Sequence, residues 1–469
     1  MPIPAAWYPR RTDIRALLSL AIPVVVIQVG MMFMGVVDTL MVGRVSPLAL
    51  ASVAIGNLYG MVVTIFAQGV LLAIDPVVTQ AVGANDRLAI ARGVQRALVL
   101  AVLLTVPISL SLLFAAPVLR GLHQQAEIVP LAGSYAALLI PGVFPYLLFS
   151  IGRQTLQALG RLKPIVVTIV GANLANILLN WVLIFGKFGA PALGVAGSSI
   201  ATSTSRWLMA IGLLAWGWRD LRPFFRPWLP ESFQVAPLLR MTRLGLPIGL
   251  QFVLEYGAFG AVALLAGVLG TVQVAAYQIA INLASITYMV PLGVSAAATV
   301  MVGRAVGRGA PADARRQAVT ALLCGAGFMV TTAAMFLLLP GPLARLYTTD
   351  PGTVALAASL IPLAGLFQVF DGTQITAIGV LRGVGDTRTP FLVSLMGYWL
   401  IGIPVSLLLG LKLSLGAVGL WWGLVVGLAA VALILLARVR RTLRGPLGRL
   451  HIDTPILEAE AGVHSIPLA

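Results

Sequence analysis

The sequence predicts an all-α membrane protein with twelve transmembrane helices, arranged as two pseudo-symmetric six-helix bundles around a central cleft. Three observations predict this fold: an apolar composition, long continuous apolar runs and an internal repeat. Of the 469 residues, 59% are apolar and only 10% are charged, whereas soluble domains carry about 25% charged residues. A soluble enzyme and a disordered or fibrous protein are therefore excluded. The apolar runs show no period of two, which excludes a transmembrane β-barrel.

Twelve apolar runs are long enough to cross a bilayer, because one helical span of a ~30 Å hydrocarbon core takes about 20 apolar residues. Charged residues, Gly-Pro clusters and Asn-Asp pairs separate the runs. The expected spans are residues 15–42, 50–79, 93–118, 129–152, 164–186, 193–217, 243–268, 272–302, 317–341, 352–381, 390–410 and 414–437. The first span is too long for a cleavable signal peptide and lacks a small-residue cleavage site, so no such peptide is expected.

The basic residues are concentrated in alternate loops. With the N-terminus inside, the inside segments hold 25 of the 31 Lys and Arg residues, the outside loops hold five, and Arg206 lies within the sixth span. This asymmetry predicts a multi-pass cell (inner) membrane protein with both termini in the cytoplasm. It also accounts for the net charge of +16 without a nucleic-acid partner.

The two halves of the sequence repeat at a nearly constant offset. The matches are Pro23 with Pro247 and Gly69 with Gly293 at 224 residues, 156–160 (LQALG) with 381–385 (LRGVG) at 225, and 194–197 with 416–419 at 222. Because each half has six spans, both enter the membrane in the same direction, and we expect an axis along the membrane normal, as in some secondary transporters. The predicted parts are an N-terminal bundle over 1–217, a cytoplasmic linker over 218–242, a C-terminal bundle over 243–444 and a mobile cytoplasmic tail over 445–469.

Four of the fifteen acidic residues lie within the predicted spans: Asp38, Asp75, Glu255 and Asp371. An acid at the centre of a transmembrane helix costs roughly 2.5–3.5 kcal/mol on insertion scales, and such residues commonly serve an ion path or a polar partner. Glu255 and Asp371 lie about 18 Å and about 16 Å from the inner ends of their spans, near the midplane, and Asp38 lies about 9 Å from the outer surface. Asp75 lies near the inner end of its span, where a helix-end polar contact is the favoured interpretation.

Two carboxyl groups in a dry cleft cannot both ionise cheaply. Such a pair holds a proton, a sodium ion or a cationic substrate, and loading it with several at once is costly. That competition is the physical basis of antiport, so we expect Glu255, Asp371 and Asp38 to couple cations. The alternative is a set of protonated acids that only hydrogen-bond across helices.

Other polar residues share helix faces with these acids. We expect them to form two polar or substrate-binding sites, with Gln28, Met34, Asn173, Asn176 and Asn180 in the N-terminal half and Gln251, Tyr256, Gln278, Asn282, Phe367 and Gln374 in the C-terminal half. The alternatives for these residues are helix-to-helix contacts and plain core or lipid-facing packing. Arg206 either neutralises a buried acid or extends toward the surface, and the sequence leaves both interpretations open.

Several other chemistries lack a supporting motif. The chain has no Gly-rich loop ending in Gly-Lys-Ser/Thr, so ATP hydrolysis is not expected. One cysteine, Cys324, and three scattered histidines leave no zinc site or disulfide, and no nucleophile–base set predicts an enzyme. No cofactor is expected, and the one metal ion considered is sodium at Glu255 and Asp371. Six plus six helices also fit a major-facilitator-like transporter, which is the first alternative.

Four segments together resemble the multidrug and toxic compound extrusion (MATE) family, in its bacterial NorM-like branch. The resemblance covers roughly residues 15–440. It rests on 37–39 (VDT) with Gly43, on 80–84 (QAVGA), on the paired acids Glu255 and Asp371, and on 381–390 (LRGVGDTRTP).

The resemblance implies twelve helices in two lobes and export of cationic, amphipathic drugs in exchange for sodium ions or protons. It places the N-lobe acid at Asp38 with Asn180 as a partner, and the C-lobe cation site at Glu255 and Asp371. Some sodium-coupled relatives have Tyr one turn before the tenth-span Asp, where this chain has Phe367. The missing hydroxyl removes one oxygen ligand, which favours protons over sodium. The implied partners are organic cations, H⁺ or Na⁺ and the lipid bilayer, with the monomer as the functional form. A lipid or metabolite flippase of the same superfamily is the second alternative.

Overall fold

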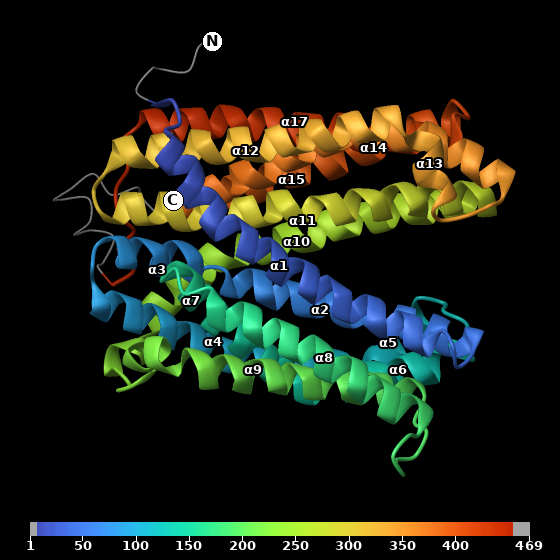
Figure 1. Ribbon diagram of the computed structural model, residues 1–469, viewed down its shortest axis with the longest axis horizontal. Coiled ribbons are helices and arrows are strands. Elements are labelled where there is room, and N and C mark those ends of the chain that lie inside the picture. Colours follow the sequence, from blue (N-terminus) through green and yellow to red (C-terminus); the bar gives the residue numbers. More distant parts are fainter. Residues whose placement is uncertain (1–6, 454–469) are drawn as a thin grey trace. The chain divides into compact units, whose positions relative to one another are not determined.

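The computed structural model describes residues 7–453, and every regular element within that range is helical. Figure 1 shows the course of the chain. The helices are α1 (Arg11–Val42), α2 (Pro47–Leu71), α3 (Ile74–Gly83), α4 (Arg87–Leu113), α5 (Ala115–Gly121), α6 (Ile128–Leu138), α7 (Val143–Ala158), α8 (Lys163–Phe185), α9 (Val195–Phe225), α10 (Val235–Leu269), α11 (Thr271–Gly307), α12 (Pro311–Leu338), α13 (Pro340–Arg345), α14 (Pro351–Val384), α15 (Arg388–Ser394), α16 (Ile403–Leu407) and α17 (Gly416–Arg444). Two π-helical segments, Leu395–Gly402 and Leu408–Lys412, flank α16.

Eleven helical segments of the described chain are long and apolar enough to cross a membrane. Helices α2 and α3 together form one of them, as do α6 and α7, and α15 continues through α16 to Lys412 as another. The predicted span 193–217 corresponds to α9, which has 31 residues and so extends for about 46 Å. Its first half contains the polar run Ser198–Arg206, and α9 is not among the eleven apolar segments.

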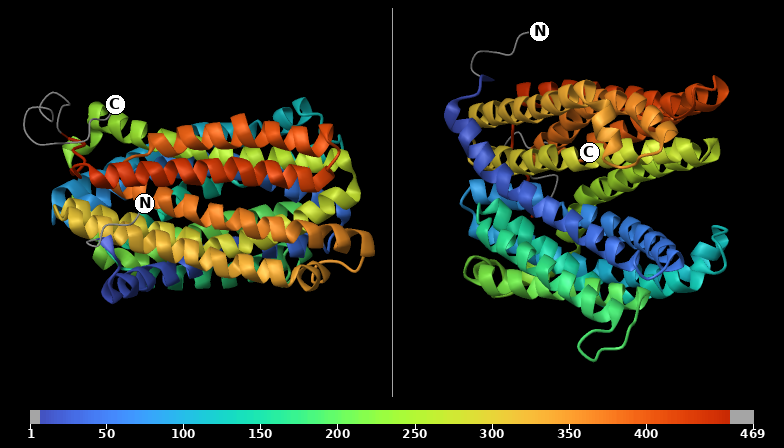
Figure 2. Two further views of the ribbon diagram at one scale, coloured as in Figure 1. Left: turned by 90° about the horizontal axis from the view of Figure 1, so that it is seen from above. Right: turned by 45° about the vertical axis from the view of Figure 1, so that its right-hand side comes forward.

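The described chain divides into two compact units. Among the described residues, unit 1 contains residues 7–25, Thr79–Asn85 and residues 250–453, and unit 2 contains Val26–Val78 and Asp86–Gly249. Within each unit the long helices run side by side (Figures 1 and 2). The units differ in detail from the predicted parts, because the start of α1 and the end of α3 pack with the C-terminal half of the sequence. Of the predicted tail, residues 454–469 lie outside the described residues, while Leu450 donates its backbone N–H to Gln80 Oε1 at 2.7 Å in unit 1.

The helix ends follow from local chemistry. The Asp86 carboxylate accepts the Ala89 N–H at 2.9 Å and caps α4, and Asp350 accepts the Thr353 N–H at 2.8 Å and caps α14. Such caps satisfy donors that the first turn leaves unpaired. The hydrogen bonds from Thr353 hold the pKa of the Asp350 carboxyl below its ordinary value. Helix α14 ends at Gly385, whose φ of 95° is open to glycine at little cost.

The internal repeat is confirmed by backbone conformation. Gly160 and Gly385, which close the aligned segments LQALG and LRGVG, both have left-handed φ angles, of 69° and 95°. Gly194 and Gly416, which open the second aligned pair, have φ angles of 53° and 60°. The two halves therefore turn at the same places for the same steric reason.

Small residues let α11 and α14 pack closely in unit 1. A Cβ added at Gly379 would lie 2.3 Å from the Ser295 carbonyl oxygen, so the two backbones meet without an intervening side chain. Ser295 Oγ donates to the Ile375 carbonyl at 2.6 Å, and Thr299 Oγ1 donates to the Gly379 carbonyl at 2.9 Å. Close backbone approach and interhelical hydrogen bonds are the usual forces between membrane helices.

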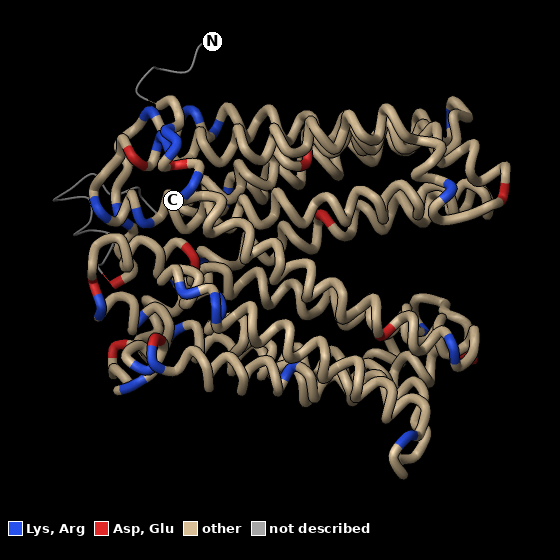
Figure 3. Tube along the Cα trace, in the orientation of Figure 1, with Lys and Arg blue, Asp and Glu red and all other residues tan. Residues whose placement is uncertain are grey.

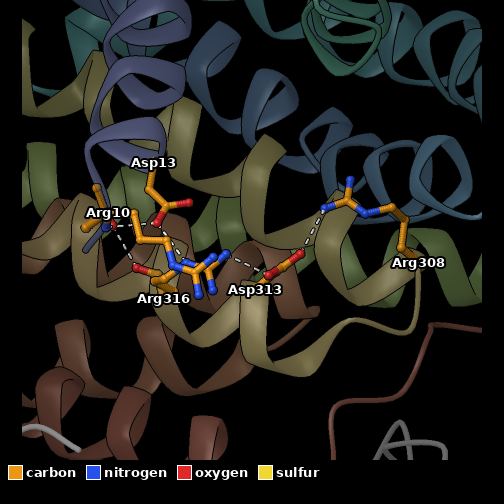
Figure 4. A network of polar contacts seen from close by, with 6 residues as sticks. Arg10, Asp13, Arg308, Asp313 and Arg316 are labelled. Atoms are coloured by element: carbon orange, nitrogen blue, oxygen red, sulfur yellow. Dashed lines mark hydrogen bonds and ion pairs between the residues drawn. The ribbon is translucent and has the colours of Figure 1, made fainter. Parts of the chain in front are cut away.

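Charged residues mark one end of each unit. In both units, Lys and Arg gather at one end of the helices (Figure 3). At that end of unit 1, Arg316 donates to Asp13 and to Asp313, both at 2.7 Å, while Asp13 also accepts the Arg10 N–H and Asp313 faces Arg308 (Figure 4). This network fixes the start of α1 to α12.

Candidate cation sites

The first candidate site surrounds Glu255 on α10, in unit 1. Its side chain is 8% exposed, and Oε1 accepts hydrogen bonds from Gln251 Nε2 at 3.0 Å, Gln374 Nε2 at 2.9 Å and Ser394 Oγ at 3.3 Å. Gln374 in turn accepts from the Tyr398 hydroxyl at 3.0 Å. All three donors are uncharged, and they use the same carboxylate oxygen. The other oxygen, Oε2, hydrogen-bonds to none of the described residues, so it is available to a proton or a metal cation.

Four helical segments position these groups, and one of them is α14, which carries Gln374. Gln251 precedes Glu255 by one turn of α10, which puts both on one face. Ser394 ends α15, and Tyr398 lies in the π-helical segment that follows at once. π-Helical turns are rare and occur frequently at functional sites.

Asp371 is the second acid of this site. It is half-buried on α14, one turn before Gln374, and it interacts electrostatically with Glu255 and with Tyr288 of α11. It forms no hydrogen bond or ion pair with any residue between 7 and 453. The two acids therefore influence each other as like charges, and a cation bound at either one relieves that repulsion.

The remaining predicted residues of the C-terminal half form no hydrogen bond with Glu255 or Asp371 in the described chain. Phe367 is buried in an aromatic cluster, with its ring centroid 6.0 Å from that of Phe259 and 5.7 Å from that of Trp421. Gln278 and Asn282 lie on an exposed face of α11, and Tyr256 is exposed on α10. Of the predicted polar set, only Gln251 and Gln374 hydrogen-bond to Glu255.

The second candidate site surrounds Asp38, in unit 2. The side chain is 6% exposed. Its Oδ1 accepts from Asn180 Nδ2 of α8 at 2.6 Å, and its Oδ2 accepts from Thr202 Oγ1 of α9 at 2.8 Å. Asn180 Nδ2 also donates to Asn176 Oδ1 at 3.1 Å. Three helices thus converge on one carboxyl group, again through uncharged donors.

The other predicted residues of this half contribute less directly. Asn173 donates to the Ile169 carbonyl of its own helix at 2.8 Å. Gln28 accepts a long contact of 3.5 Å from Arg153, and Met34 is buried. Hydrogen bonds therefore link Asn180 and Asn176 to Asp38, and they do not link Asn173 or Gln28 to it.

Arg206 follows Thr202 by one turn of α9. Its guanidinium carbon lies 5.0 Å from the centroid of the Tyr146 ring, and the charge interacts favourably with Asp38. The buried Nη1 finds no hydrogen-bond partner within the described chain. Arg206 therefore faces the interior of unit 2, where it stacks on an aromatic ring and partly balances a buried acid. Asp75, the other residue left open, interacts electrostatically with Arg153.

Sequence reasoning missed Thr202, Ser394 and Tyr398. None of them shares a helix with the acid whose site it joins, so spacing along one helix could not reveal it. The only available signal was the polar run Ser198–Arg206 in an otherwise apolar span. In the described range, no group of three or more His, Cys, Asp or Glu side chains could hold a metal ion.

Comparisons with known proteins agree on one family. The profile of the MatE family matches residues 23–182 and 247–408. The chain is 36% identical over 454 residues to the multidrug resistance protein MdtK of Pectobacterium atrosepticum, with 94% of this chain and 98% of that protein covered. Its fold matches the crystal structure of the eukaryotic MATE transporter AtDTX14, with a TM-score of 0.84, 26% identity and coverage of 92% and 96%. It also matches a MOP superfamily transporter from Pyrococcus furiosus in fold, with a TM-score of 0.83, 21% identity and the same coverage.

Proposed function

This chain belongs to the MatE (multidrug and toxic compound extrusion) family, and from that premise we propose that it is a secondary active antiporter. It exports cationic, amphipathic drugs from the cytoplasm by alternating access, in exchange for protons or sodium ions. Membership in this family removes the major-facilitator alternative. The relative with 36% identity is named a multidrug resistance protein, which supports the substrate class.

The proposed orientation places both termini in the cytoplasm of a cell that carries the protein in its inner membrane. The support is the concentration of Lys and Arg at one end of each unit (Figure 3), since cytoplasmic loops are enriched in these residues. The monomer is proposed as the working form, because each candidate site is built within one unit of a single chain.

The observation that carries the mechanism is the set of hydrogen bonds at Glu255. Three neutral donors hold one carboxylate oxygen and leave the other unbonded. The three donors orient the carboxylate without adding a charge of their own, while the charge of Arg382 acts on it electrostatically, and we propose that a cation binds there and later leaves. Asp38, held by Asn180 and Thr202 and partly balanced by the charge of Arg206, offers a second exchangeable position.

Protons are the favoured coupling ion. Sodium requires several oxygen ligands, whereas a proton requires one carboxylate oxygen. The residue one turn before Asp371 is Phe367, which packs in an aromatic cluster and offers no oxygen. One charge moving across 100 mV yields about 2.3 kcal/mol, which sustains a gradient of roughly 40- to 50-fold.

Transport in proteoliposomes tests the proposal. A fluorescent organic cation is loaded, and its movement is followed after a pH or sodium gradient is imposed. We expect Glu255→Gln and Asp371→Asn to lower gradient-driven movement to the rate without a gradient. The matched controls are Glu127→Gln and Asp350→Asn, which make the same chemical changes at acids outside the helical bundles, and we expect both to transport like the parent.

The outcome separates the candidate functions. If both unit 1 variants transport like the controls, the assignment of the coupling site to Glu255 and Asp371 is wrong. If Asp38→Asn alone abolishes movement, coupling resides in unit 2. Replacement of sodium by choline at fixed pH identifies the ion. Movement of a labelled lipid without any movement of the dye would instead favour the flippase alternative.

A further inference from the structure

A groove of basic and aromatic side chains lies at the end of α9 in unit 2. It is lined by Trp218 and Arg222 of α9 and by Arg226, Pro227 and Trp228 of the following loop, around a volume of about 540 Å³. We call these five residues the basic groove. Trp218 and Trp228 are 38% and 48% exposed, and both arginines are exposed as well. The groove is therefore open to a ligand from outside the unit.

The two arginines of the basic groove have no partner to neutralise them. Neither guanidinium group forms a hydrogen bond or ion pair with any residue in the described range. The nearby acid Asp220 pairs with a different arginine, since its Oδ1 lies 3.5 Å from Nε of Arg161. Two exposed guanidinium groups that line one groove are suited to bidentate recognition of a phosphate group.

The loop that carries half of the groove is held firmly by α4. Gln95, which is fully buried, donates to the carbonyl groups of Phe224 and Pro227 at 3.2 and 2.8 Å. Its Oε1 accepts from the Leu229 N–H at 2.9 Å and from Ser232 Oγ at 2.8 Å. One side chain thus fixes four points of the loop, and a site already held in place loses less conformational entropy when a ligand binds.

An exposed stripe of α9 leads into the groove. Leu208, Ile211, Ala215, Trp218 and Arg222 follow at steps of three and four residues, so they lie on one face of the helix, and all five are exposed. The order along this face is aliphatic, then aromatic, then cationic. The same order of chemistry occurs along a phospholipid, from acyl chain through the interface to phosphate, and tryptophan is enriched at that interface. A free phosphate would use only the arginines.

We propose that the basic groove binds the phosphate headgroup of an anionic phospholipid, whose acyl chain lies along the aliphatic part of this stripe. The proposal rests on the proposed orientation, which places this end of α9 at the cytoplasmic leaflet, where anionic lipids are concentrated. Basic pockets at that leaflet are known to select such headgroups. The bound lipid would anchor the loop between the two halves of the sequence to the membrane surface.

The test measures lipid binding directly and needs no transport. The full-length protein is placed in nanodiscs of phosphatidylcholine with a trace of labelled phosphatidylglycerol, and the label held by the protein is measured. We expect the double variant Arg222→Gln/Arg226→Gln to lower the affinity roughly 30-fold, since each arginine that contacts the bound headgroup is expected to contribute a factor of about five. The control Arg87→Gln/Arg219→Gln removes the same charge from exposed positions of unit 2 outside the groove, and we expect it to bind like the parent.

Three results would overturn the proposal: equal binding by the groove variant and the parent, an equal loss in the control, or displacement of the lipid by inorganic phosphate at a similar concentration. The last result would mark the groove as a site for soluble phosphate. Elution of each variant as a single symmetrical peak in size-exclusion chromatography shows that it is folded. Lipid binding is measured at equilibrium and does not depend on drug export. The result therefore tests the lipid site even if the proposed export function is wrong.

Discussion

Gly379→Ala tests the packing that holds unit 1 together. The added Cβ would lie 2.3 Å from the Ser295 carbonyl oxygen and 2.5 Å from its Oγ, whereas ordinary contacts begin at 3.4 Å. Helix α14 must therefore move from α11 by about 1 Å. Overpacking of this kind typically costs about 1–3 kcal/mol. The shift also weakens two interhelical hydrogen bonds, each contributing about 0.6 kcal/mol in membrane proteins. We expect a total loss of about 2–4 kcal/mol.

The measurement is thermal unfolding in detergent, followed by the fraction of protein that still elutes as a monomer. The control is Gly327→Ala on α12, where an added Cβ meets no atom within 4 Å. Alanine is the better helix former by about 1 kcal/mol, so we expect the control to unfold at or above the parental temperature. Equal unfolding temperatures for the two variants would refute the close approach of α11 and α14.

Three further predictions concern individual side chains. Thr202→Val removes the hydroxyl donor to Asp38. We expect Asp38 to hold the coupling cation more tightly and maximal dye efflux to fall roughly 3- to 20-fold, with recovery in Thr202→Ser. Phe367→Tyr should increase the sodium dependence of efflux, measured against choline at fixed pH, and an unchanged dependence contradicts the role given to this position. Asp350→Ala should lower the unfolding temperature at pH 7. The folded-state pKa of Asp350 is lowered, so its contribution to stability is present above the ordinary pKa and is lost as pH falls through the lowered value. The difference in unfolding temperature between the variant and the parent should therefore shrink in acid.

The sequence was sufficient to predict the helices and the repeat, because both depend on local composition. Continuous apolar runs identify spans regardless of what packs against them, and aligned glycines such as Gly160 and Gly385 adopt the same left-handed conformation because the same turn requires it. The polar helix α9 shows where composition alone is weak. Its Ser and Thr residues lower its hydropathy, and one of them, Thr202, donates to a buried acid.

The candidate sites could be predicted only in part, because spacing along one helix reveals neighbours on that helix and nothing across it. Gln251 was predicted beside Glu255 from a single turn of α10. Ser394 was not predicted, since it approaches Glu255 from a different helix. Gln278 and Asn282 share a helix face as predicted, but that face is exposed. A polar stripe indicates that a helix face contacts either a polar partner or solvent. The stripe alone does not distinguish between the two.

The repeat duplicates the backbone without duplicating the acids. At the offset of 224 residues that relates Pro23 to Pro247, Asp38 corresponds to Val262 and Glu255 corresponds to Met31. Val262 is fully buried in an apolar cluster, so unit 1 has no polar site where unit 2 holds Asp38. Pseudo-symmetry therefore governs turns and helix packing, while each half of the sequence holds its own carboxyl group with different donors. Because the two carboxyl environments differ, we expect single substitutions of Asp38 and Glu255 to have different effects on transport.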